Sequence, residues 1–224
     1  RLVVAGAEKL NDEIRKTYTE KFGIRILEGY GATECAPVLS ANTPMANLNG
    51  SVGQFVPGLE HKLESIPGID SGGLLHVRGE NVMKGYYLFD KPGVLNPPEE
   101  GWYNTGDIVE VDAQGFIHIK GRVKRFAKVA GEMVSLEVVE KIASTAAPEH
   151  QHAASTQTDV QRGENIVLFT SDPGLKREDL QIVAKNLGSP EIAIARKIIH
   201  LEEFPLLGTG KTDYVTLKKM AEAA

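Results

Sequence analysis

The sequence predicts a mixed α/β protein with an α/β portion over residues 1–49, a β-barrel-like portion over 50–120 and a small α+β domain over 121–224. Two observations support this fold class. Helical periodicity is present near the N-terminus, disappears between residues 50 and 120, and returns after residue 121. A length of 224 residues is enough for one large or two small domains.

The α/β assignment rests on a strand, a helix and a second strand. Arg1 to Ala5 is a short, mostly apolar run, as expected of a buried parallel strand. Apolar or aromatic side chains recur at positions 10, 14, 18 and 22 along one helical face, and Gly23 ends that helix. A second strand is predicted over 24–27. Because no cap or turn precedes the first strand, we expect the chain to be a piece of a longer protein.

The remaining predicted elements are separated by glycine and proline turns. Short β segments are expected at 60–65, 73–78 and 115–119. After residue 121 the patterns predict a helix, a strand, a helix, a strand and a closing helix, in this order over 136–143, 166–170, 175–187, 194–200 and 212–223.

The composition is that of an ordinary soluble protein, with 42% hydrophobic and 25% charged residues. No apolar run approaches the roughly 20 residues of a membrane-spanning helix. The net charge of −5 argues against nucleic acid as a partner. The single cysteine, Cys35, excludes an internal disulfide and fits a reducing compartment.

The clearest candidate binding motif is Gly29-Tyr30-Gly31-Ala32-Thr33-Glu34, directly after the second strand. In α/β folds, ligands bind just beyond the carboxyl ends of the strands. The glycines allow close approach of backbone to a ligand, and Tyr30 can stack on a base. The Thr33 hydroxyl can bond phosphate oxygens, and the Glu34 carboxylate suits Mg²⁺. Taken alone, a glycine turn that ends in polar residues is an equally good interpretation.

Two other candidate residues are weak when taken singly. Asp107 ends a Tyr-Asn-Thr-Gly-Asp segment and can accept two hydrogen bonds from a ribose diol, although a plain turn explains it better. Lys211 follows a Gly-Thr-Gly loop and can reach a phosphate or carboxylate, although a surface lysine is again the simpler interpretation.

A cluster of four cations lies within seven residues at the predicted domain junction. Its members are Arg122, Lys124, Arg125 and Lys128. Such clusters are usually solvated faces, but the position at a junction favours a hinge or an anion site.

These segments, in this order, resemble the superfamily of adenylate-forming enzymes, which includes acyl-CoA synthetases, adenylation domains of peptide synthetases and luciferases. The resemblance covers essentially the whole chain. It implies that residues 1–120 are the C-terminal part of an AMP-binding large domain and that 121–224 form a mobile C-terminal domain. It also implies ATP and Mg²⁺, activation of a carboxylic acid as an acyl-adenylate, and transfer of the acyl group to a thiol.

The resemblance assigns a role to each matching residue. Nucleotide contacts are implied for Gly6, Ala7, Glu8, Tyr30, Gly31, Thr33, Asp107 and Arg122. Catalytic roles are implied for Thr33, for Glu34 as the Mg²⁺ ligand, and for Lys211 as a bridge between the carboxylate and the α-phosphate. Lys124 matches the hinge residue, and Gly131 matches a glycine that lines a pantetheine tunnel.

Two departures from the family pattern limit these expectations. Lys124-Arg125 stands where many members carry an acidic pair; lysine is a known variant at the first position, whereas Arg125 is less usual. The Gly- and Ser/Thr-rich phosphate loop of the family is missing. We therefore expect this chain alone to bind nucleotide weakly and to show no turnover.

Several segments narrow the resemblance to the bacterial acyl-acyl-carrier-protein synthetases, which also act as 2-acylglycerophosphoethanolamine acyltransferases. They are Gly29 to Pro37, Trp102 to Ile108, Arg125 to Glu137 and Pro205 to Lys211. This implies ligation of a long-chain fatty acid to acyl carrier protein. It also implies acyl transfer to a lysophospholipid by an N-terminal domain absent from this chain, and a parent protein at the cytoplasmic side of the inner membrane.

Alternatives remain open for the acceptor and for the function. Arg125 and Lys128 can contact an acidic carrier protein, or can be solvated. A fatty acyl-CoA ligase would share all of these motifs. A catalytically silent nucleotide-binding module is the third possibility, and the retention of both Glu34 and Lys211 argues against it.

Overall fold

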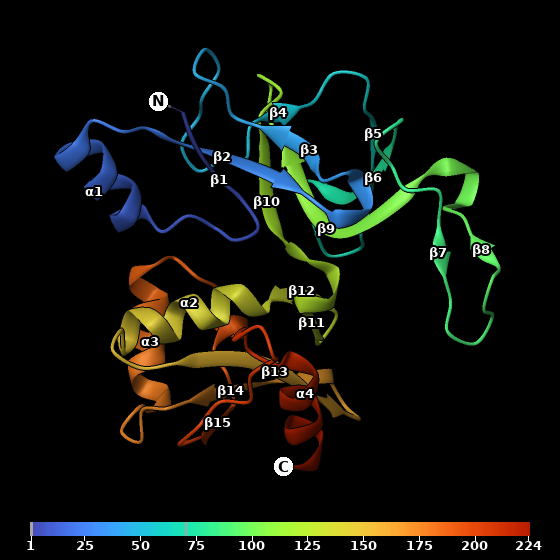
Figure 1. Ribbon diagram of the computed structural model, residues 1–224. Coiled ribbons are helices and arrows are strands. Elements are labelled where there is room, and N and C mark those ends of the chain that lie inside the picture. Colours follow the sequence, from blue (N-terminus) through green and yellow to red (C-terminus); the bar gives the residue numbers. More distant parts are fainter. Residues whose placement is uncertain (1, 70) are drawn as a thin grey trace. The chain divides into compact units, whose positions relative to one another are not determined.

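The computed structural model describes residues 2–69 and 71–224, and its chain divides into two compact units, Arg1–Val123 and Lys124–Ala224 (Figure 1). Arg1, where the first strand was expected to begin, lies outside the described residues. The sequence placed the division at residue 121. No helix in the described ranges is long and apolar enough to cross a membrane.

The first unit begins with the predicted β-α-β arrangement. Strand β1 (Val3–Ala5) pairs in parallel with β2 (Ile26–Gly31), and α1 (Asp12–Phe22) connects them. The Asn11 side chain caps α1 by accepting from the Glu13 amide at 2.7 Å. Gly23 ends the helix in the left-handed region, at φ 63°. The apolar face of α1 is exposed, since none of its residues is buried.

Two four-stranded sheets make up this unit. The first has the order β1-β2-β3-β4 and the second the order β10-β9-β6-β5. The remaining bounds are β3 Val38–Ala41, β4 Gln54–Phe55, β5 Glu60–Glu64, β6 Gly73–Arg78, β9 Tyr103–Val111 and β10 Ile117–Arg122, with a separate hairpin of β7 Tyr86–Tyr87 and β8 Leu95–Asn96. The buried side chains of Cys35, Leu39, Leu75, Val77, Val109 and Ile117 form one core cluster that draws on both sheets.

The fold class predicted from sequence is confirmed, but the expected barrel does not close. Among the described residues, β5 and β10 lie at opposite edges of the second sheet. The reason is found at the edge of β10 that does not face β9. There the Ile117 carbonyl accepts from the Val52 amide, and the Ile117 amide donates to the Gly53 carbonyl, both at 2.9 Å. These two residues lead directly into β4, so the outer backbone groups of Ile117 are satisfied by the segment before β4 and not by β5.

The second unit is a five-stranded sheet with helices on both faces. The strands are β11 Phe126–Val129, β12 Glu132–Ser135, β13 His152–Asp159, β14 Gly163–Thr170 and β15 Lys197–His200, and the helices are α2 Leu136–Ala146, α3 Arg177–Asn186 and α4 Tyr214–Ala223. Alternation along β14 divides the core. Ile166 and Leu168 belong to the cluster with α2 and α3, whereas Val167 and Phe169 belong to the cluster with α4.

Candidate active site

Three residues predicted to bind the nucleotide meet in the first unit. Tyr30 on β2 donates a hydrogen bond to Asp107 on β9, with 2.5 Å between Oη and Oδ2. Arg122 lies opposite Asp107 in the β9–β10 pair, with 3.0 Å between Nε and Oδ1. Each carboxylate oxygen of Asp107 therefore has one protein partner. Since a carboxylate offers about four lone-pair positions, ribose hydroxyls can still be accepted.

Burial differs sharply within this group. Asp107 is only 5% exposed, whereas the Arg122 side chain is 70% exposed. The neighbouring Thr105 hydroxyl accepts from the Asp107 amide at 3.1 Å and donates to the Leu75 carbonyl at 2.9 Å, which fixes the backbone of the motif. Burial, followed by the charge of Asp107, raises the pKa of the Tyr30 hydroxyl far above its usual value, so Tyr30 stays a neutral donor.

The first three residues of the glycine motif, Gly29 to Gly31, end strand β2, and only the later residues form a turn. Gly29 and Tyr30 pair with Ala41 and Ser40 on β3, which keeps the backbone extended. A Cβ at Gly31 would lie 2.1 Å from the Pro37 carbonyl oxygen, so no side chain fits there. Gly31 is thus required by the close approach of the Pro37 backbone, where the chain turns back from β2 to β3, whether or not a ligand binds.

The segment predicted to contact the nucleotide, Gly6 to Glu8, leaves β1 beside this motif. Ala5 pairs with Glu28, and a Cβ added at Gly6 would lie 3.4 Å from the Gly29 carbonyl oxygen. Ala7 adopts a left-handed conformation with φ 70°, which is uncommon for alanine. Gly6, Ala7 and Glu8 are all exposed.

Glu34 lies in a short 3₁₀ turn, Thr33–Cys35, just after β2. Its Oε1 accepts from the Tyr86 hydroxyl at 2.6 Å, and its carbonyl accepts from the Met83 amide at 2.7 Å. The hydrogen bond from Tyr86 lowers the pKa of the Glu34 carboxyl and keeps it ionised. Thr33 is exposed. Tyr86 was not predicted from sequence, because only the fold brings β7 to this turn.

Cys35, next to Glu34, is fully buried in the core of the first unit. Burial, followed by the nearby charge of Glu34, raises the pKa of its thiol to about 11. The side chain is therefore a packed thiol and not a nucleophile.

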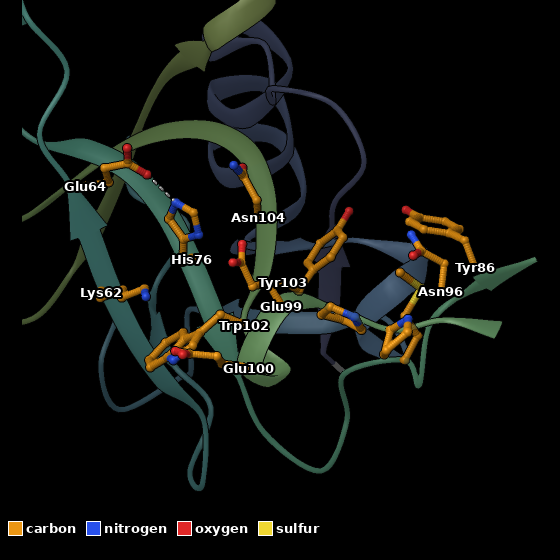
Figure 2. Close-up of a pocket in the computed structure, with 13 residues that line it drawn as sticks. Lys62, Glu64, His76, Tyr86, Asn96, Glu99, Glu100, Trp102, Tyr103 and Asn104 are labelled. Carbon is orange, nitrogen blue, oxygen red and sulfur yellow. Dashed lines mark hydrogen bonds and ion pairs between the residues drawn. The ribbon is translucent and has the colours of Figure 1, made fainter. Parts of the chain in front are cut away.

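A pocket of about 610 Å³ lies next to the Glu34–Tyr86 pair, and Met83, Tyr86 and Tyr103 line it (Figure 2). At its other side His76 and Glu64 form a pair with 2.8 Å between Nε2 and Oε2. The Trp102 ring is covered by two cations, Lys62 at 4.5 Å and Arg78 at 4.6 Å from the ring centroid. Sequence reasoning missed this pocket, because it is built from strands and a hairpin that are distant in the chain.

The fit of a magnesium ion can be judged from the donor set. In the ranges that the structure describes, no group of three or more His, Cys, Asp or Glu side chains could hold a metal. Mg²⁺ in nucleotide sites is held by one or two carboxylates together with waters and phosphate oxygens. A single ionised Glu34 beside the nucleotide residues fits that pattern, in which the ion would neutralise phosphate charge.

The predicted residues of the second unit lie in two tight turns and at its start. Lys124 is exposed and is the first residue of the unit. Gly131, at φ 92°, and Ala130, at φ 52°, form the two-residue turn between β11 and β12. Lys211 is exposed on a turn closed by a hydrogen bond of 2.7 Å from the Leu207 amide to its carbonyl.

The two candidate carrier-protein contacts differ in their surroundings. Arg125 bonds Glu140 at 2.5 Å and the Ala154 carbonyl at 2.8 Å, and stacks 3.8 Å from the Tyr214 ring centroid. Its side chain is only 15% exposed, so the charge is used within the second unit. Lys128 is exposed on β11. The structure therefore leaves Lys128 as the accessible member of this pair.

Comparisons with known proteins agree with these motifs. The family model described as AMP-binding enzyme matches residues 1–87. The long-chain-fatty-acid–CoA ligase of Salmonella typhimurium is 30% identical over 94% of this chain, and the 3-hydroxybenzoate–CoA/4-hydroxybenzoate–CoA ligase of Thauera aromatica is 29% identical over all of it. The chain is therefore similar to the superfamily of AMP-binding enzymes, through the family model over its first 87 residues and through these ligases over nearly its whole length. It spans 38% and 44%, respectively, of these two relatives, so the comparison covers less than half of their length.

Solved structures show that the chain has the fold of the adenylate-forming ligases. The acyl-adenylate complex of o-succinylbenzoate CoA synthetase from Bacillus subtilis matches with a TM-score of 0.80 and 23% identity, over 97% of this chain and 46% of that one. ATP-bound MatB from Rhodopseudomonas palustris matches with a TM-score of 0.78 and 22% identity, over 98% of this chain and 45% of that one.

Proposed function

We propose that the longer protein containing this chain is an ATP-dependent acid–thiol ligase that joins a long-chain fatty acid to acyl carrier protein. The adenylation step is supported by one observation: Tyr30, Asp107 and Arg122 come from three different strands and contact one another. A buried carboxylate held between a neutral donor and a cation is suited to receive ribose hydroxyls at a fixed place. These three residues are among those that the sequence resemblance assigns to the nucleotide, and their contacts with one another support that assignment.

In the first step, a carboxylate oxygen of the fatty acid attacks the α-phosphorus of ATP. The new O–P bond replaces the bond to pyrophosphate, which leaves. Lys211 supplies positive charge where the two anions approach, and Asp107, Arg122 and Tyr30 hold the nucleoside in line. Glu34 would hold the magnesium ion, which neutralises phosphate charge when bound.

In the second step, the thiolate of the acceptor attacks the acyl carbonyl of the acyl-adenylate, and the C–O bond to AMP breaks. The sequence resemblance assigns Gly131, which adds no side chain to the turn between β11 and β12, to the passage of the pantetheine arm. Rotation of the second unit about Lys124 would exchange Lys211 for this turn between the two steps. The division of the chain directly before Lys124 supports this assignment.

The acceptor is the finer part of the proposal. The sequence resemblance to acyl-acyl-carrier-protein synthetases favours an acidic carrier protein, and the exposed Lys128 on β11 offers a cation for it. The same resemblance extends the proposal to acyl transfer onto a lysophospholipid by a separate domain at the bacterial inner membrane. CoA is the alternative acceptor, and the names of the fatty-acid relatives favour it for those proteins.

The experiment supplies the full-length protein with Mg-ATP and labelled palmitate, and offers holo-acyl carrier protein and CoA separately. We expect thioester on the carrier protein, and loss of both pyrophosphate release and thioester in Lys211→Ala. Lys185→Ala, on the exposed side of α3, removes the same charge and serves as the control. Thioester mainly on CoA would replace the carrier protein in this proposal. Nucleotide binding without pyrophosphate release would indicate a silent binding module.

A further inference from the structure

The connection between β6 and β7 holds the backbone of the short turn that carries Glu34. The Asn81 side chain donates from Nδ2 to the carbonyls of Cys35 at 3.0 Å and Val38 at 3.1 Å. The Met83 amide donates to the Glu34 carbonyl at 2.7 Å. The turn is therefore fixed at Glu34 and on its C-terminal side by a segment that lies more than 40 residues further along the chain.

The side chain of Glu34 is held by the strand that follows this connection. Tyr86, the first residue of β7, donates from its hydroxyl to the Oε1 atom of Glu34 at 2.6 Å. Its backbone pairs with Asn96 on β8, and the two side chains lie next to each other in Figure 2. Gly85 adopts φ 147°, and a Cβ there would lie 2.4 Å from the Asn96 carbonyl oxygen. The close pairing of β7 with β8 thus sets the point from which the Tyr86 ring extends to Glu34.

This hydrogen bond restricts a side chain that is otherwise flexible. A glutamate carboxylate samples several positions when nothing holds it, and ordering it on binding costs conformational entropy. A phenol is rigid, so its hydroxyl selects one position for the carboxylate. Because a carboxylate has about four lone-pair positions, the bond to Oε1 leaves others for a cation. Carboxylates that bind metal ions are commonly oriented by such a hydrogen bond from a neighbouring group.

We propose that Tyr86 is a positioning residue for Glu34, whose carboxylate it holds in the orientation that binds Mg²⁺ with the nucleotide. This inference rests on the function proposed above, in which Glu34 is the magnesium ligand. The neighbouring Tyr87 provides an internal comparison. It pairs with Leu95 in the same hairpin and is 71% exposed, and the described residues offer its hydroxyl no hydrogen-bond partner.

Calorimetry on the full-length protein tests the proposal with the non-hydrolysable nucleotide α,β-methylene-ATP, in Mg²⁺ and in EDTA. The quantity of interest is the factor by which Mg²⁺ tightens nucleotide binding. Tyr86→Phe should reduce this factor about tenfold and leave binding in EDTA unchanged, as expected when the partner of a metal-binding carboxylate is lost. General damage to the site would instead weaken binding in both conditions. Tyr87→Phe removes a hydroxyl from the adjacent position and should keep the factor of the unaltered protein.

Glu34→Gln shows whether Tyr86 acts through the carboxylate. In that background Tyr86→Phe should cause no further loss of the Mg²⁺ effect, because the two residues act as one unit. Additive losses would overturn the proposal, and so would an unchanged factor in Tyr86→Phe alone. If Mg²⁺ does not tighten nucleotide binding by the unaltered protein, the metal role of Glu34 and this proposal both fail. Pyrophosphate release by the unaltered protein distinguishes that result from a failure of the adenylation step itself.

Discussion

Tyr30 and Asp107, 77 residues apart, are joined by a hydrogen bond of 2.5 Å between their side chains. Tyr30 belongs to the first sheet of the N-terminal unit and Asp107 to the second, so one contact links the two sheets. It also orients the carboxylate that we assign to the ribose. Because this hydrogen bond contributes to both the fold and the site, a Tyr30 variant can be measured separately for protein stability and for nucleotide binding.

Tyr30→Phe should lower the free energy of unfolding by about 2 kcal/mol. The substitution keeps the ring but removes the hydroxyl that donates to Asp107. The Asp107 carboxylate, which is 5% exposed, then lacks one of its hydrogen bonds. Urea unfolding followed by the fluorescence of Trp102, the single tryptophan and a member of the same unit, measures this loss. Tyr18→Phe, at an exposed position on α1, is the control and should leave the midpoint unchanged. Equal midpoints for all three proteins would show that the bond contributes nothing.

Gly31→Ala should destabilise the first unit severely. An added Cβ would meet the Pro37 carbonyl oxygen at 2.1 Å, and β2 and β3 would have to separate to relieve the overlap. We expect a loss of about 3 kcal/mol or more, comparable with other steric conflicts in packed regions. Gly208→Ala, where nothing lies within 4 Å of the added atom, should be neutral. Comparing the yields of soluble protein and the urea midpoints of the two variants decides the point.

The sequence predicted many elements in their places, because helical periodicity and glycine stops depend on neighbouring residues, whereas the strands β9, β11, β12 and β13 were not predicted. The helices at α1, α2, α3 and α4 and the strands at β5, β6, β14 and β15 lie where the patterns placed them. The barrel failed because closure depends on which edge meets β10. That edge is filled by Val52 and Gly53, and no local pattern reports a pairing between residues so far apart.

The candidate site divides in the same way. Asp107, Tyr30 and Arg122 were proposed from motifs, since each stands in a recognisable segment, and the fold brings them into contact. Tyr86, which bonds Glu34, was missed because it comes from a two-residue strand without a motif. The neighbouring cations in the sequence suggested that Arg125 contacts a carrier protein. Its actual partners are Glu140 on α2 and Tyr214 on α4, and the sequence does not report these contacts.

Arg125→Ala should therefore act on stability and not on docking. The guanidinium forms an ion pair with Glu140 in which both side chains are mostly covered, at 15% and 18% exposure. Removing one partner of such a pair leaves a largely buried charge, and we expect a loss of about 3 kcal/mol from the second unit. Hydrogen–deuterium exchange of α2 and β13 should show faster opening. Lys128→Ala, an exposed cation on β11, is the control and should exchange like the unaltered chain.

Asp213 gives the second unit a defined dependence on pH close to the Lys211 turn. It caps α4, with Oδ1 accepting from the amides of Val215 at 3.0 Å and Thr216 at 3.1 Å, and Oδ2 accepting from the Thr216 hydroxyl at 2.7 Å. The hydrogen bond from the Thr216 side chain, followed by that from its amide, lowers the pKa of the Asp213 carboxyl. Its own amide donates to the Pro205 carbonyl at 2.8 Å, which closes the segment carrying Lys211.

Because the folded-state pKa of Asp213 lies below its unfolded value of about 3.9, the carboxylate stabilises the folded state above that value. This contribution is lost as the pH falls through the folded-state pKa. Asp213→Asn keeps an acceptor but has no charge, so its urea midpoint, followed by circular dichroism, should lie below that of the unaltered chain at pH 7. The two midpoints should converge as the pH falls below about 4. A gap that stays constant down to pH 2 would mean that the charge of Asp213 does not stabilise the cap.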